Sequence, residues 1–128
     1  MASEVSPLRH RSLWIVCGAA FVAFVIYESV TPAPIDAPTL EGFKIGLILA
    51  YLWITFWFAQ IWRAPGQRVA TAIAFTLMGI ALEYVQRATG YRHFAYADMW
   101  DDGIGAALGF ALAFTVLGRA LETIDRRL

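Results

Sequence analysis

Residues 45–62 read Ile45-Gly-Leu-Ile-Leu-Ala-Tyr-Leu-Trp-Ile-Thr-Phe-Trp-Phe-Ala-Gln-Ile-Trp62 and contain no charged residue. A transmembrane helix needs about 17–25 apolar residues. A transmembrane strand needs only about 9–11, with polar and apolar residues alternating. Because this stretch is apolar on every face, it predicts a membrane-spanning helix. Its aromatic residues become more frequent toward Trp62, and we interpret them as an interfacial belt that contacts lipid.

Three further stretches are apolar enough to cross a bilayer: residues 13–30, 69–85 and 104–121. Each carries one charge near an end, where headgroups and water limit the cost of desolvation. The first is interpreted as an uncleaved anchor, because Thr31-Pro-Ala-Pro34 after it offers no clean signal-peptide cleavage site. The sequence therefore predicts an all-α fold, a single integral membrane four-helix bundle over residues 1–128.

The composition of the whole chain agrees with this prediction. Of its 128 residues, 59% are hydrophobic and 16% are charged, compared with about 25% charged residues in soluble domains. Ten basic and ten acidic side chains cancel, which argues against a nucleic-acid-binding protein. Cys17 is the only cysteine, so a disulfide framework is excluded. No soluble-enzyme motif is present, and we expect neither a cofactor nor a metal.

Basic residues set the expected orientation, because the cytoplasmic side of a membrane protein carries the excess of lysine and arginine. With four spans, seven of them fall on one side: Arg9, Arg11, Arg63, Arg68, Arg119, Arg126 and Arg127. Three fall on the other side: Lys44, Arg87 and Arg92. We therefore expect both termini in the cytoplasm and the linkers 31–44 and 86–103 outside.

Helical geometry brings the polar residues near the last linker onto two faces, because positions i, i+4, i+7 and i+11 lie on one side of a helix. The fourth span has one such face: Asp98, Asp102, Gly105 and Gly109. The third span has another: Gly79, Glu83 and Gln86. Small residues let helices approach closely in lipid, so we expect the two faces to meet.

A meeting of these faces would place three carboxylates, an amide and the Arg92 guanidinium in one partly dry pocket. Neighbouring carboxylates do not all ionise freely. Such a pocket suits a divalent cation, a polar or cationic headgroup, or acid–base chemistry. The alternative is structural: an Asp cap at the start of the fourth helix, paired with Arg92.

These residues resemble the signature of the VanZ-like family. The signature reads ExxQ, then an arginine, then D-xxx-N-xx-G-xxx-G. Every spacing matches from Glu83 to Gly109, with Asp102 in place of the usual Asn. Upstream, Ser29-Val-Thr-Pro32 is similar to the S-x-x-P that often ends the family's first helix.

A second family motif, DKxxHxxxY, is only partly present. Lys44 and Tyr51 match it, but Phe43 and Leu47 stand where the family has Asp and His. The missing histidine argues against any mechanism that needs an acid–base group at position 47.

The resemblance implies a small multi-pass protein of the bacterial inner (cytoplasmic) membrane with about four helices. The family takes its name from a member that confers low-level resistance to the glycopeptide teicoplanin. Our first hypothesis is an outward pocket that engages an envelope lipid or cell-wall precursor and so alters glycopeptide access. The second is a structural or assembly subunit of a larger membrane complex. The third is an enzyme acting on lipid headgroups, with Glu83 or Asp98 as base. We favour a non-enzymatic role, with membrane lipid as the partner.

Overall fold

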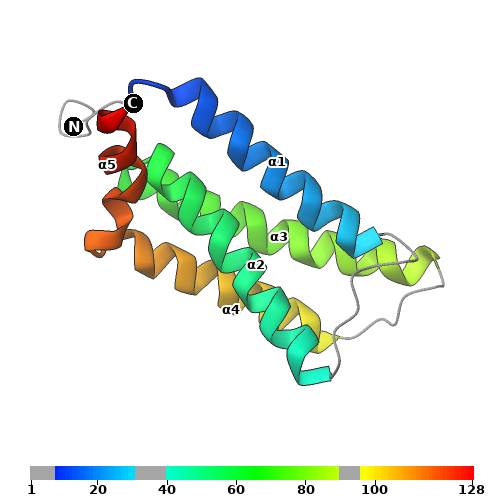
Figure 1. The fold of residues 1–128 in the computed structure, drawn as a ribbon. Helices are drawn as coiled ribbons and strands as arrows, with labels where there is room; N and C mark the ends of the chain where they lie inside the picture. The colour runs from blue at the N-terminus through cyan, green and yellow to red at the C-terminus, as the bar shows by residue number, and fades with distance from the viewer. Residues whose placement is uncertain (1–7, 31–39, 90–95) are drawn as a thin grey trace.

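The computed structural model describes residues 8–30, 40–89 and 96–128, without the side chains of residues 40–44, 89 and 96–98. All regular structure in these ranges is helical, which confirms the predicted all-α class for this part of the chain (Figure 1). The elements are α1 (Arg11–Val30), α2 (Leu40–Ile61), α3 (Pro65–Thr89), α4 (Tyr96–Ala113), the 3-10 helix η2 (Val116–Arg119) and α5 (Ala120–Arg127).

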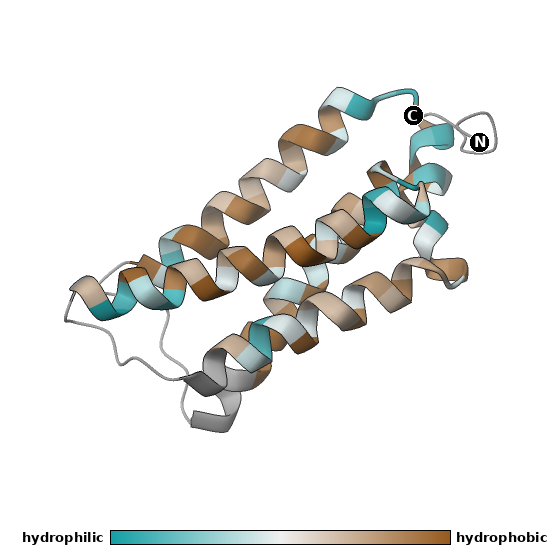
Figure 2. Ribbon diagram, turned by 180° about the vertical axis from the view of Figure 1, so that it is seen from behind, coloured by the Kyte–Doolittle hydropathy of each residue, from teal (hydrophilic) through white to brown (hydrophobic). Residues whose placement is uncertain are grey.

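Two or three membrane spans fit the lengths and apolarity of these helices. Within the described ranges, α1 and residues 65–88 of α3 are each long and apolar enough to cross a membrane. The helix α4 is long and apolar enough only when it is joined to η2 and α5. The described apolar part of α2, Ile45–Ile61, is shorter. Hydrophobic residues cover the middle of the long helices, and hydrophilic residues gather mostly at their ends (Figure 2). This distribution is compatible with a multi-pass membrane protein.

The fourth predicted span, residues 104–121, is not one straight helix. The helix α4 ends at Ala113, and the chain bends by 75° before it continues through η2 and α5. The Thr115 hydroxyl caps the new turn by accepting a hydrogen bond from the Leu117 N–H at 3.2 Å. A side chain at Gly118 would overlap the Ala113 carbonyl, so the turn needs glycine. The average hydropathy of the sequence does not show this break, because Thr115 and Gly118 are also common in membrane helices.

The predicted outer linker, residues 86–103, is also shorter than expected. The helix α3 continues to Thr89, and α4 begins at Tyr96. The apolar window underestimated both helices because polar residues at a membrane surface extend a helix without raising its hydropathy.

Two glycines set α4 directly against α2, and this is the most extensive helix contact in the described part of the chain. A Cβ atom on Gly105 would overlap the Ile48 carbonyl oxygen, and one on Gly109 would overlap that of Leu52. The predicted meeting of this face with the third span is wrong for its two glycines, Gly105 and Gly109. A stripe on a helix inside a bundle can touch two neighbours, and here its glycines meet α2.

The turn between α2 and α3 is short and locally capped. The helix α3 begins at Pro65, a first helical position where the missing N–H has no intrahelical role. The Gln67 side chain accepts a hydrogen bond from the Ala64 N–H at 3.3 Å, and the Arg68 N–H donates to the Ala64 carbonyl at 3.0 Å. Both bonds fix the direction in which α3 leaves the turn.

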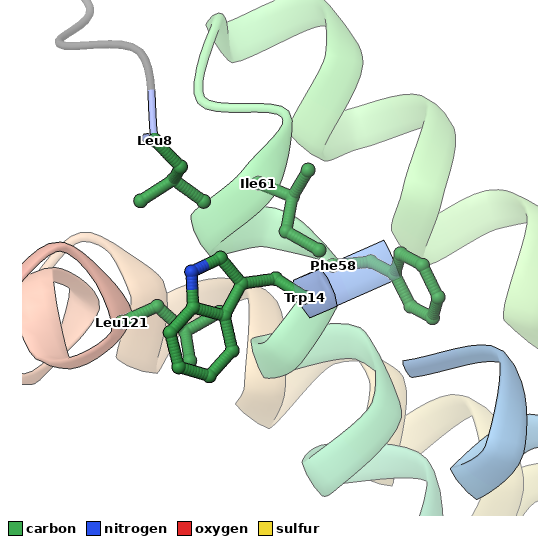
Figure 3. Packing of buried hydrophobic residues seen from close by; sticks show 5 residues of the cluster. All are labelled: Leu8, Trp14, Phe58, Ile61 and Leu121. Carbon is green, nitrogen blue, oxygen red and sulfur yellow. The ribbon is translucent and has the colours of Figure 1, made fainter. Parts of the chain in front are cut away.

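The helix α5 closes one end of the bundle (Figure 1). Figure 3 shows the buried cluster at this end: Leu8, Trp14, Phe58, Ile61 and Leu121. The indole N–H of Trp57 donates to the Trp14 carbonyl at 2.9 Å, which ties α2 to α1. The interpretation of the aromatic residues as a lipid-facing belt is therefore wrong for Phe58, which is 6% exposed. It fits Trp53, which is 43% exposed.

A buried carboxylate joins the two ends of the described chain. Asp125, 2% exposed, accepts hydrogen bonds from the backbone N–H groups of Arg9 at 2.5 Å and His10 at 2.9 Å. The His10 Nδ1 atom and the Trp14 indole nitrogen each lie 3.0 Å from the carboxylate. Burial alone would raise the pKa of Asp125, but these four contacts outweigh it and hold the pKa below its ordinary range.

We expect Asp125 to make stability depend on pH at the acidic end. A carboxylate whose pKa is lowered by folding stabilises the fold above its unfolded pKa, which is about 3.9. That contribution is lost as the pH falls from there toward the lower folded pKa. Asp125→Asn should therefore lower the melting temperature at pH 7 and flatten its decline below about pH 4. Thermal melts against pH, with exposed Thr123→Asn as control, check this. Parallel curves for wild type and Asp125→Asn would contradict it.

Candidate functional site

Two polar side chains of α3 are buried toward the end of the bundle opposite α5. Glu83 is 4% exposed and Gln86 is 7% exposed. The Gln86 amide donates to the Ser29 carbonyl at 2.6 Å, which ties α3 to the last turn of α1. The Ser29 hydroxyl in turn donates to the Val25 carbonyl at 2.8 Å. Residues of the predicted signature thus fix the crossing of these two helices.

The helix α4 contributes a third buried polar side chain. Asp102, 3% exposed, packs directly on Gly79 of α3. A Cβ atom at Gly79 would lie 2.5 Å from the Asp102 Oδ2 atom and 2.7 Å from its Cβ. Because glycine alone leaves room for this carboxylate, α3 and α4 meet at this point, as helical geometry predicted for Gly79 and Asp102.

The helix α2 adds Tyr51, which the sequence indicates only through its match to the VanZ-like motif. Tyr51 is 1% exposed, and both Asp102 and Glu83 lie close enough for their charges to act on it. Its backbone is held near α4 by Gly105, where a Cβ atom would lie 3.0 Å from that of Tyr51. We call Tyr51, Glu83, Gln86 and Asp102 the polar cluster. Only the resemblance could have pointed to Tyr51, because its helix has no polar face.

Two other predicted members cannot be placed beside this cluster. Arg92 lies outside the described residues. Asp98 lies one turn before Asp102 in α4, and its side chain is not among those described. No group of three His, Cys, Asp or Glu side chains in the described ranges is placed to hold a metal ion.

The arrangement sets strong electrostatic limits on a ligand. Two carboxylates and a phenol from three helices share a site with little access to water. Ionisable groups at this depth are expensive unless a proton, a cation or a hydrogen-bond donor compensates them. The cluster therefore suits a donor-rich or cationic group better than an anion.

Comparisons of the chain with protein-family models, with curated proteins and with solved structures found no match. The resemblance to the VanZ-like family therefore rests on the signature residues alone.

Proposed function

We propose that this chain is a VanZ-like protein of the bacterial inner membrane whose polar cluster engages an envelope lipid or a cell-wall precursor. Occupying such a precursor would alter the access of glycopeptides such as teicoplanin. One observation carries the proposal: Glu83, Asp102 and Tyr51 converge from three different helices at a buried position. Polar residues that face the inside of a membrane bundle are usually functional.

The proposal includes a four-span topology in which the polar cluster lies toward the outside. Both ends of the described chain meet at the α5 end, where Arg9 contacts Asp125. The cluster lies toward the other end of the bundle. We place that end outside, because most arginines lie near the α5 end and the cytoplasmic side carries the excess of basic residues. A ligand in the outer leaflet would then reach the cluster without crossing the membrane.

The charge of the polar cluster narrows the ligand class. Glu83 and Asp102 are both acidic, and the stretch from one to the other holds four acidic residues and two arginines, Arg87 and Arg92. A bound amine or another cationic headgroup would compensate the excess negative charge of these carboxylates. We therefore propose an amine-bearing lipid or precursor as the ligand.

Teicoplanin susceptibility tests this function in cells that express the protein. Wild type should shift susceptibility, and Glu83→Gln should remove most of that shift because it deletes one charge with little change of shape. Asp101→Asn is the matched control, since Asp101 adjoins Asp102 in sequence but points about 100° away around the helix. Equal susceptibility with wild type and with Glu83→Gln, at equal expression, would overturn the proposal.

A groove on the membrane face favours the second candidate, an assembly subunit. The groove lies between α3 and α4, has a volume of about 200 Å³ and is lined by Ala72, Ile73, Thr76, Leu77, Gly103 and Ala107. Four of these six residues are small (Ala72, Thr76, Gly103 and Ala107), and small residues let a helix of another subunit approach closely. Purification in mild detergent separates the candidates, because a subunit should retain a protein partner in fixed stoichiometry.

A further inference from the structure

A second charged site lies at the α5 end of the bundle, away from the polar cluster. Arg68, near the start of α3, is 4% exposed. Its Nε atom donates to the Ala59 carbonyl at 2.9 Å, and its guanidinium carbon lies 4.7 Å from the centre of the Phe114 ring. The Nη2 atom is buried and has no hydrogen-bond partner in the described ranges. A buried donor without an acceptor is costly.

A second arginine adds to this positive charge. Arg63, in the turn before α3, donates from Nη1 to the Gly118 carbonyl at 2.8 Å. It lies close enough for its charge to act on Arg68. Among the described side chains, ion pairs join His10 to Asp125 and Arg126 to Glu122. Neither arginine of the turn has a carboxylate partner among those side chains, so the pair carries uncompensated positive charge.

We propose that Arg63 and Arg68 bind the phosphate of an anionic phospholipid. A guanidinium presents several donors in a fixed plane, which matches phosphate oxygens. The buried Nη2 donor of Arg68 supplies a hydrogen bond that no described protein group accepts. The turn joins two apolar helices, so a membrane places it at the level of the headgroups, where lipid phosphates lie.

An apolar groove beside the turn favours a lipid over free phosphate. It has a volume of about 340 Å³ and is lined by Trp62, Gln67, Ala70, Thr71, Ala74 and Phe75. It begins at the same turn and follows α3 into the apolar region. Neither arginine lines the groove, but its lining includes Trp62 and Gln67 on the two sides of the turn that carries Arg63. We therefore assign a phosphate at the arginines and an acyl chain in the groove to one molecule.

Thermal melts of the full chain in neutral detergent test this site. Phosphatidylglycerol should raise the melting temperature in a saturable way. Phosphatidylcholine with the same acyl chains and inorganic phosphate should not. Arg63→Gln should raise the half-saturating phosphatidylglycerol concentration about tenfold, as expected for one lost charged hydrogen bond. Arg63→Lys should recover part of the affinity. Arg127→Gln, exposed at the same end, should behave as wild type.

Three results would each overturn the assignment. They are equal stabilisation by the two lipids, a matching effect of inorganic phosphate, and equal losses with Arg63→Gln and Arg127→Gln. None of them bears on the polar cluster, because the titrations do not involve Glu83. The proposal for the arginines can therefore fail or succeed independently of the proposed function.

Discussion

Replacing Gly105 with alanine should destabilise the protein by about 1–3 kcal/mol, the usual range for overpacking. The new methyl group would overlap the Ile48 carbonyl oxygen and press on Tyr51. A backbone carbonyl cannot rotate away as a side chain does, so α4 must move from α2. Because this contact is the most extensive between described helices, the melting temperature in detergent should fall clearly.

Gly103 provides the matched control on the same helix. A Cβ atom there would meet only the Thr76 methyl group, at an ordinary contact distance of 3.6 Å. Gly103→Ala should therefore be neutral or gain up to about 1 kcal/mol from helix propensity. If the Gly105→Ala and Gly103→Ala variants have the same melting temperature, the close approach of α2 and α4 is refuted.

Replacing Glu83 with glutamine should weaken binding of a cationic ligand by roughly thirtyfold or more while the fold remains intact. Loss of one partner of a buried, hydrogen-bonded charge pair removes about 2 kcal/mol or more, and 1.4 kcal/mol corresponds to tenfold in affinity. Glutamine has nearly the same shape as glutamate, so the packing around this buried side chain is retained.

Asp102→Asn should behave differently from Glu83→Gln. It introduces the Asn that the VanZ-like signature usually has at the matching position, and it keeps the contact with Gly79. It also relieves repulsion between the two carboxylates. We therefore expect near-neutral stability and retained ligand binding, which separates a specific role of Glu83 from a general effect of negative charge.

The sequence was most informative where apolar runs are long and helical faces are polar. The uncharged run ending at Trp62 predicts its helix, and the spacing of Gly79, Glu83 and Gln86 predicts the face that α4 meets through Asp102. These signals are local, because the spacing of polar residues and the length of an apolar run can each be seen within a single helix.

Features that depend on two elements could not be derived in the same way. Thr115 and Gly118 turn the chain by forming hydrogen bonds and a close approach that an apolar window does not register. The run containing Tyr51 is apolar all round, so no periodicity shows which side faces inward. For the same reason the partner of Gly105 was assigned to the wrong helix.

The most direct test of the central claim is lipid mass spectrometry of the protein purified in mild detergent. We predict that wild type and the control Asp101→Asn retain the same amine-bearing lipid or precursor in fixed proportion. Asp102→Asn should retain it too, whereas Glu83→Gln should lose it. Identical retained lipids in wild type and in folded Glu83→Gln would contradict the claim that the polar cluster is a binding site.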